Sequence, residues 1–128
     1  MKATIDIGTN SVRLLVAERG QGTMVPLVKE SIITRLGQNV DQAGNLDPKA
    51  VDRTIETLIF FKEKRIPRGI TPRVIATSAV RDAENRAEFL RDVRLKTGWD
   101  VQVLTGTQEA RLSFRGALNA LEPERIQE

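Results

Sequence analysis

Residues 6–11 form a polar segment between two apolar runs near the start of the chain. Residues 3–5 precede it and residues 12–17 follow it, and both runs favour β-strands. Because the polar connection is so short, it predicts a tight β-hairpin. Gly8 and Asn10 in this turn allow several successive backbone N–H groups to point into one concavity, an arrangement that can hold a phosphate oxygen.

Polar side chains around this turn allow two interpretations. Thr9 and Ser11 add hydroxyl donors, and Asp6 places a carboxylate at the end of the first strand. A phosphate beside a carboxylate favours a divalent cation, since Mg²⁺ binds through one or two carboxylates and the phosphates of a substrate. The same residue types also occur in hairpin turns that bind nothing. The turn by itself therefore leaves both interpretations open.

Several classes of chemistry are excluded by residue types that the sequence lacks. The chain has no cysteine and no histidine, which removes thiol nucleophiles, Ser-His-Asp catalysis and histidine-based zinc sites. Any proton transfer must then use a carboxylate, a lysine or water. With 128 residues, the chain is long enough for one domain with a buried core.

The charge pattern bears on partners and location. The 20 basic and 17 acidic residues are interspersed and give a net charge of +3, so no charged arm for nucleic acid is present. Four Phe and one Trp provide no stacking platform for single strands. No apolar run approaches membrane-spanning length, and the chain starts with Met1 and a strand rather than a signal peptide. We therefore expect a cytoplasmic protein that binds neither nucleic acid nor a membrane.

Hydrophobic periodicity and turn residues predict five strands and three helices. The strands are expected at residues 2–7, 12–19, 23–35, 72–77 and 99–104. The helices are expected at residues 48–65, 85–98 and 105–123, which gives the order βββαβαβα. Asp47 is the expected N-cap of the first helix, and Asn85 begins a capping-box sequence in the second. Pro26 predicts an edge position or a bulge for the third strand.

The second half of the chain alternates strand, helix, strand, helix and strand. This alternation calls for right-handed parallel crossovers. The first three strands, joined by short turns, form an antiparallel meander. Together the two halves predict an α/β fold with one five-stranded mixed sheet and helices packed on it.

Three segments together resemble a known family. They are residues 6–15 (Asp-Ile-Gly-Thr-Asn-Ser-Val-Arg-Leu-Leu), 75–83 (Ile-Ala-Thr-Ser-Ala-Val-Arg-Asp-Ala) and 104–112 (Leu-Thr-Gly-Thr-Gln-Glu-Ala-Arg-Leu). With the Arg-Leu-Gly sequence at residues 35–37, they make the chain similar to the exopolyphosphatase / guanosine pentaphosphate phosphohydrolase (Ppx/GppA) family over essentially its whole length. The opening turn alone would not suffice, because sugar kinases, acetate kinases and chaperone ATPases share it.

The resemblance implies a ribonuclease H-like, actin-like ATPase fold, built from two such domains with a catalytic cleft between them. Residues 1–128 would be the N-terminal domain of this two-domain phosphatase. The family's second phosphate loop should follow the last helix, and the sequence contains nothing like it. We therefore expect the chain to carry half of an active site, with the missing second domain as its partner.

The resemblance also assigns roles to two charged residues. Glu109 matches the family's catalytic glutamate, and Arg81 matches a phosphate-contacting arginine. The alternatives are an acidic residue favoured only by the helix dipole and a solvated surface arginine. Gln108 departs from the family pattern, since many relatives have a second acidic residue there, so it receives no metal or base role. Arg13 and Arg111 are interpreted as structural.

By the same resemblance, the 6–11 segment would bind substrate and metal. The terminal phosphates would contact backbone and hydroxyl groups of Gly8, Thr9, Asn10 and Ser11. Asp6 would hold Mg²⁺. The implied reaction is metal-assisted hydrolysis of a terminal phosphoanhydride in inorganic polyphosphate, guanosine pentaphosphate or both.

Two other functions stay open. One is another phosphotransferase of the same fold, a kinase or ATPase, although such enzymes do not carry the sequence of residues 105–111 in this form. The other is a non-catalytic module that forms a homodimer through the apolar surface that a lone first domain would expose. A ribonuclease H-type nuclease is disfavoured because the sequence shows no suitable carboxylate cluster. We expect the isolated chain to hydrolyse neither polyphosphate nor guanosine pentaphosphate.

Overall fold

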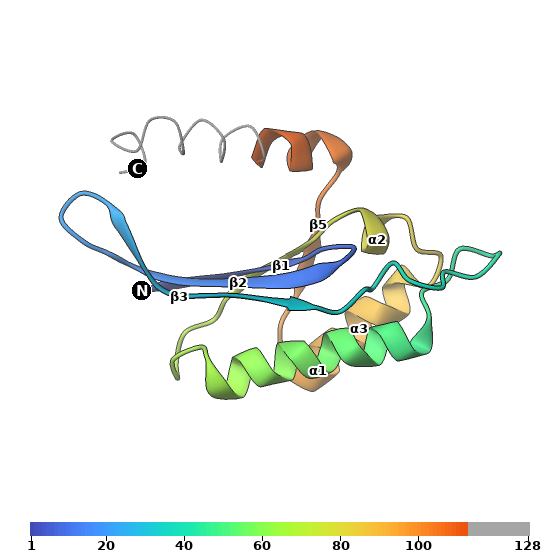
Figure 1. Cartoon of the computed structure of the whole chain (residues 1–128), viewed down its shortest axis with the longest axis horizontal. Helices are drawn as coiled ribbons and strands as arrows, with labels where there is room; N and C mark the ends of the chain where they lie inside the picture. Colours follow the sequence, from blue (N-terminus) through green and yellow to red (C-terminus); the bar gives the residue numbers. More distant parts are fainter. Residues whose placement is uncertain (113–128) are drawn as a thin grey trace.

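The fold is a mixed β-sheet with helices packed on it, as the computed structural model shows for residues 1–112, the part of the chain that the structure describes. The five strands are β1 (Lys2–Ile7), β2 (Ser11–Arg19), β3 (Met24–Ile33), β4 (Arg73–Ala76) and β5 (Val101–Val103). Their order in the sheet is β3-β2-β1-β4-β5. The first three strands are antiparallel neighbours, whereas β1, β4 and β5 run parallel (Figure 1). The predicted α/β class and five-stranded mixed sheet are confirmed.

The helices are α1 (Pro48–Lys64), α2 (Ser78–Arg81) and α3 (Arg86–Thr97), and residues 106–112 are also helical. In Figure 1, α1 and α3 cover one face of the sheet, and the helix at residues 106–112 lies on the other side. The rest of the helix predicted to end at Pro123 lies outside the described residues. Among the helices that the structure describes, none has the length and apolar character needed to span a membrane.

Strand β2 alternates between the two faces of the sheet. Leu14 is 2% exposed and packs in the core with Leu58 and Phe61 of α1. Burying a side chain of this size contributes about 1.5–3 kcal/mol. Leu15, the next residue, is 37% exposed on the opposite face, which also carries Asp6 of β1. We call this second face, which α1 and α3 do not cover, the open face.

The prediction for Pro26 is confirmed. β3 is an edge strand, and its pairing with β2 shifts register between Val16 and Ala17, where Ala17 lies opposite Pro26. Pro26 lacks a backbone N–H, and an edge strand with a local irregularity tolerates that loss.

Three local features differ from the expectation. The single-turn helix α2 is not predicted, because four residues are too few to show a helical period. The Asn85 side chain does not cap α3; it accepts the Leu46 N–H at 2.9 Å and donates to the Leu46 carbonyl at 3.4 Å. A tertiary contact therefore replaces the predicted local cap. Asp47 precedes Pro48 at the start of α1 as expected, but its side chain makes no capping hydrogen bond.

Candidate active site

The site residues suggested by the sequence come together at one end of the sheet. β1, β4 and β5 are parallel, so their carboxyl ends meet at one edge, the place where open α/β sheets bind ligands. The 8–11 turn follows β1, and Arg81 ends the short helix that follows β4. Glu109 lies in the helical segment that follows β5. The parallel crossovers therefore bring three distant segments to the same edge.

The 8–11 turn is closed by its own backbone. The Gly8 N–H donates to the Ser11 carbonyl at 2.9 Å, which commits this N–H to the turn. Among the hydrogen bonds of residues 1–112, the N–H groups of Thr9 and Asn10 have no backbone acceptor. The backbone donors that the turn can offer to an anion are therefore at its tip.

A second loop, residues 34–37, holds the turn by its carbonyl groups. The Asn10 carbonyl accepts the N–H groups of Thr34 and Arg35, both at 3.0 Å, and the Thr9 carbonyl accepts the Gly37 N–H at 3.0 Å. Arg35 has a left-handed backbone with φ of +52°, a conformation that costs a residue other than glycine about 1–2 kcal/mol. Two successive N–H groups that converge on one acceptor form a nest. In this protein, that nest fixes a carbonyl group of the turn.

A hydroxyl contact ties the turn to α2 on its other side. Thr9 Oγ1 and Ser78 Oγ lie 3.0 Å apart, within hydrogen-bond distance. The Thr77 N–H also donates to the Ile7 carbonyl at 3.3 Å, which extends the β1–β4 pairing up to the start of α2. The turn therefore has polar contacts to the 34–37 loop and to the β4–α2 junction.

Arg81 and Glu109 contact each other directly. Arg81 Nη1 donates to Glu109 Oε1 and to the Leu104 carbonyl, each at 3.1 Å. The Arg81 side chain is 27% exposed and its Nε lies 3.6 Å from Asp82 Oδ1, so it is not a freely solvated arginine. The guanidinium and the carboxylate orient each other through a charge-assisted hydrogen bond.

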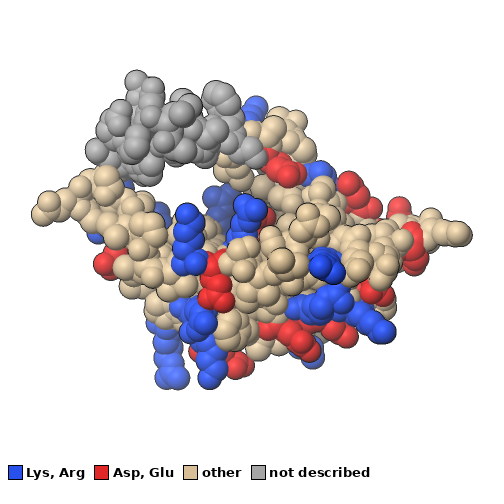
Figure 2. Space-filling model, viewed as in Figure 1, with Lys and Arg blue, Asp and Glu red and all other residues tan. Residues whose placement is uncertain are grey.

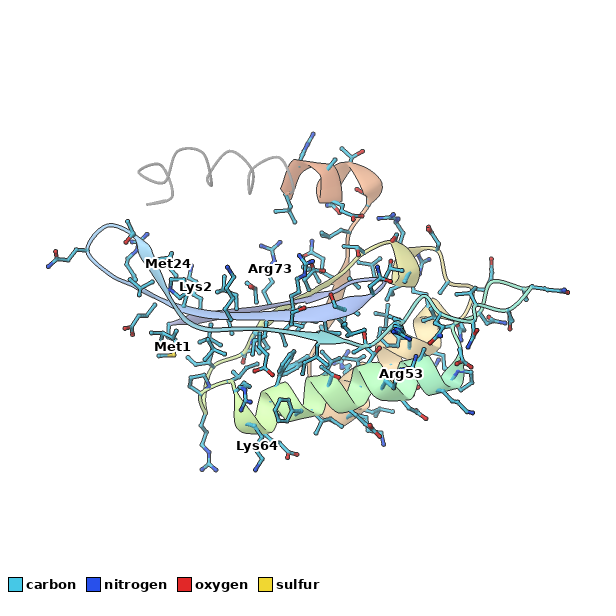
Figure 3. All side chains as sticks on the ribbon, viewed as in Figure 1. Met1, Lys2, Met24, Arg53, Lys64 and Arg73 are labelled. Atoms are coloured by element: carbon cyan, nitrogen blue, oxygen red, sulfur yellow. The ribbon has the colours of Figure 1, made fainter. Side chains whose placement is uncertain are left out.

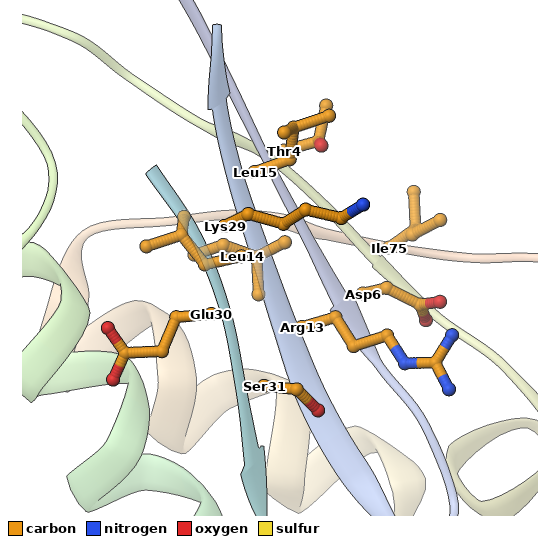
Figure 4. Close-up of a pocket in the computed structure, with 10 residues that line it drawn as sticks. Thr4, Asp6, Arg13, Leu14, Leu15, Lys29, Glu30, Ser31 and Ile75 are labelled. Atoms are coloured by element: carbon orange, nitrogen blue, oxygen red, sulfur yellow. The ribbon is translucent and has the colours of Figure 1, made fainter. Parts of the chain in front are cut away.

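Asp6 lies at the end of β1, directly opposite Arg13 of β2, and Figure 4 shows the two side chains next to each other on the open face. Asp6 Oδ1 is buried and has no hydrogen-bond partner among the described residues. Burial raises the pKa of Asp6; the charge of Arg13 lowers it, and the charge of Glu109 raises it further. Glu109 is thus close enough for its charge to raise the pKa of the Asp6 carboxyl.

The donor set around Asp6 fits a cation that is shared with a substrate. A buried carboxylate oxygen without a partner is a suitable ligand for a hard cation. Within residues 1–112, no group of three or more acidic residues could hold a metal by itself. Mg²⁺ needs only one or two carboxylates when phosphates and waters complete its coordination. The residues present therefore fit Mg²⁺ held jointly by Asp6, phosphate and water.

The open face carries a hollow of about 500 Å³ that extends to Asp6 and Arg13. Its lining includes both apolar and charged side chains, among them Leu15, Ile75, Arg13, Lys29 and Asp6 (Figure 4). Over the face of the molecule seen in Figure 2, basic and acidic side chains are interspersed, in agreement with the sequence. Figure 3 shows basic side chains on both sides of the sheet, with Arg73 on the open face and Arg53 on α1.

Sequence reasoning missed two contributors to this arrangement. Ser78 and the 34–37 loop both contact the 8–11 turn, and neither has a predicted role. The available signal was that both lie in segments that carry the family resemblance. No local pattern shows that a residue far along the chain will accept or donate a hydrogen bond at the turn.

The fold and the position of the site define a class of protein. A five-stranded mixed sheet with a hairpin turn at the carboxyl edge of its parallel strands is a ribonuclease H-like domain of the actin-like ATPase fold. The model of the Ppx/GppA phosphatase family matches residues 15–127. The chain therefore belongs to the Ppx/GppA phosphatase family.

Relatives and solved structures agree with this assignment. Exopolyphosphatase 2 of Mycobacterium tuberculosis is 41% identical over 135 residues, which cover 93% of this chain and 40% of that protein. An Aquifex aeolicus family member matches with a TM-score of 0.77 and 35% identity, covering 85% of this chain and 36% of that chain. An exopolyphosphatase from Cytophaga hutchinsonii matches with a TM-score of 0.84 and 30% identity, covering 90% and 37%. The chain thus spans about 40% or less of the length of these relatives.

Proposed function

We propose that this chain supplies the first half of an active site that hydrolyses terminal phosphoanhydride bonds of inorganic polyphosphate, guanosine pentaphosphate or both. The family and the relatives named exopolyphosphatases support hydrolysis of polyphosphate. The observation that carries the proposal is the convergence of the 8–11 turn, the Arg81–Glu109 pair and Asp6 at one edge of the sheet.

The 8–11 turn would bind the terminal phosphates. Thr9 and Asn10 have backbone N–H groups without a backbone acceptor in the described part of the chain, and Thr9 and Ser11 add hydroxyl groups. Arg81 would supply a guanidinium that can form two parallel hydrogen bonds to one phosphate. These donors would stabilise the charge that spreads over the equatorial oxygens during phosphoryl transfer.

Glu109 would accept the proton of the attacking water. The chain has no histidine, so a carboxylate is a suitable general base. The contact between Glu109 Oε1 and Arg81 Nη1 at 3.1 Å suggests how substrate binding could free the Glu109 carboxylate to act as a base. A phosphate that binds the guanidinium competes with the carboxylate for the same donors, and the released carboxylate can then contact a water.

Asp6 would hold Mg²⁺, with phosphate and water as the other ligands. The bound ion would neutralise charge on the phosphates and orient them. Asp6 Oδ1, buried without a hydrogen-bond partner among residues 1–112, is the atom available for this role.

The test compares the 128-residue chain with the same chain extended by its downstream sequence. Phosphate release is measured from polyphosphate and from guanosine pentaphosphate, with and without Mg²⁺. We expect no turnover by the chain alone and Mg²⁺-dependent turnover by the extended protein. The ratio of the two rates in the extended protein identifies the preferred substrate. Appreciable turnover by the chain alone would refute the half-site proposal, and no turnover of either substrate by the extended protein would refute the function.

A further inference from the structure

Gly37 lies in unusually close contact with the 8–11 turn. A Cβ atom built on Gly37 would be only 2.5 Å from Thr9 Cγ2. The next atoms it would meet, the Thr9 carbonyl oxygen and Thr9 Cβ, would be 3.7 and 3.8 Å away, which is ordinary contact. The clash therefore arises from one methyl group of one residue.

That methyl group cannot move aside without disturbing the turn. Thr9 is β-branched, so rotating Cγ2 away from Gly37 also rotates Oγ1. Thr9 Oγ1 is 3.0 Å from Ser78 Oγ, so this rotation would break the link to α2. Moving the loop instead would break the 3.0 Å hydrogen bond from the Gly37 N–H to the Thr9 carbonyl. Each way of relieving the clash displaces the turn or removes one of its supports.

We propose that Gly37 is a positioning residue for the 8–11 turn, because the absence of a side chain lets the 34–37 loop hold Thr9 with its hydroxyl on Ser78 and its N–H available to an anion. The proposal rests on the phosphate-binding role of the turn given above. It adds a residue that contacts neither substrate nor metal. It also specifies the atom through which that residue acts, Thr9 Cγ2.

The chain offers a matched control at the other end of β2. A Cβ built on Gly20 would lie 2.8 Å from Val25 Cγ2, so Gly20→Ala also introduces a clash with a branched side chain. Gly20 lies between β2 and β3, away from the carboxyl edge of the parallel strands. Val25 is 42% exposed, so its side chain can turn toward solvent.

The experiment is a double-mutant cycle in the 128-residue chain. Gly37→Ala is made in the wild type and in a Thr9→Ser background, since serine keeps the hydroxyl group and lacks Cγ2. The affinity for inorganic tripolyphosphate with Mg²⁺ is measured by calorimetry. The amide resonances of residues 8–11 are recorded by NMR without ligand.

We expect Gly37→Ala to weaken tripolyphosphate binding about tenfold or more in the wild type, because small displacements of a binding group have large effects. In the Thr9→Ser background the same change should cost less than about threefold, and Gly20→Ala should cost less than about twofold. An equal loss in both backgrounds, no loss in either, or an equal loss from Gly20→Ala would overturn the proposal. If the Gly37→Ala variant does not fold, the affinity of the double variant Thr9→Ser/Gly37→Ala is compared with that of Thr9→Ser alone. Affinity equal to that of Thr9→Ser supports the coupling, and a tenfold deficit overturns it.

The ligand-free spectra separate this inference from the proposed function. If the wild-type chain does not bind tripolyphosphate, the phosphate-binding role fails, and the turn resonances then test the coupling alone. Shifts at residues 8–11 in Gly37→Ala that disappear with Thr9→Ser support it. Unchanged turn resonances in Gly37→Ala overturn it.

Discussion

Strand β2 has a tight turn at each end, and the two turns have similar compositions but different surroundings. Within residues 1–112, the 20–23 turn is closed by the hydrogen bond from the Gly20 N–H to the Thr23 carbonyl at 2.7 Å. The 8–11 turn has an equivalent bond from Gly8 and is also held by the 34–37 loop and by Ser78. A turn already fixed in one conformation loses less entropy when it binds a ligand. Both turns contain glycine and hydroxyl residues, so composition does not distinguish them; their contacts with other segments do.

The largest expected effect is on the rate of phosphate release, and it compares an acidic residue at the candidate site with one near the 20–23 turn. In the protein extended by its downstream sequence, Glu109→Gln should lower the rate of phosphate release by about 10²–10⁴, the usual contribution of a general base. The matched control is Glu18→Gln, an exposed acidic residue near the 20–23 turn, which should leave the rate within about twofold. Retained activity in Glu109→Gln would remove Glu109 from the mechanism.

The next effect concerns β2 itself, which connects the two turns. Leu14 is 2% exposed in the core and Leu15 is 37% exposed on the open face. Leu14→Ala should lower the free energy of unfolding by about 2–5 kcal/mol, whereas Leu15→Ala should lower it by less than about 1 kcal/mol. Urea denaturation of both variants measures the difference. Equal losses would show that the open face is packed as tightly as the helix-covered one.

A smaller effect is expected from Asp6→Asn, measured without divalent cations. Burial raises the pKa of Asp6, so the Asp6 carboxyl group holds its proton more tightly in the folded state than in the unfolded state. The ionised side chain therefore destabilises the fold above its folded pKa, and this effect disappears as the pH falls toward the unfolded pKa. Asp6→Asn should stabilise the chain by up to about 1 kcal/mol at neutral pH. The gain should shrink on acidification, and a variant that is less stable than the wild type at neutral pH would contradict this expectation.

The smallest effect is expected at Asp41, in the loop before α1. Hydrogen bonds from the Asn45 backbone, at 2.9 Å, and side chain, at 3.2 Å, lower the pKa of Asp41. This carboxylate therefore stabilises the fold above its unfolded pKa, and its contribution is lost as the pH falls through the lower folded pKa. Asp41→Asn should slightly reduce thermal stability at neutral pH and leave it unchanged in acid. An unchanged melting temperature at neutral pH would show that this exposed loop adds nothing measurable.

The sequence predicts the sheet because its signals are local. The alternation of strands and helices indicates the parallel crossovers, and Pro26 indicates the edge strand. The family resemblance singles out Arg81 and Glu109. Each follows a parallel strand, so both lie at the same edge of the sheet as the 8–11 turn. Whether these residues have their proposed roles stays a prediction.

The remaining features depend on contacts between distant segments. Asn85 satisfies its sequence pattern for a cap yet binds Leu46 instead. The need for glycine at position 37 arises only because the Thr9 methyl group lies against it in the fold. Such constraints belong to pairs of residues, so neither sequence segment shows them alone.

The most direct test of the account follows the amide resonances of the wild-type chain during titration with tripolyphosphate and Mg²⁺. If the 8–11 turn binds phosphate, the resonances of residues 8–11 should show large, saturable shifts and those of residues 20–23 none. Shifts of equal size in both turns, or shifts confined to residues away from the 8–11 turn, would contradict the account.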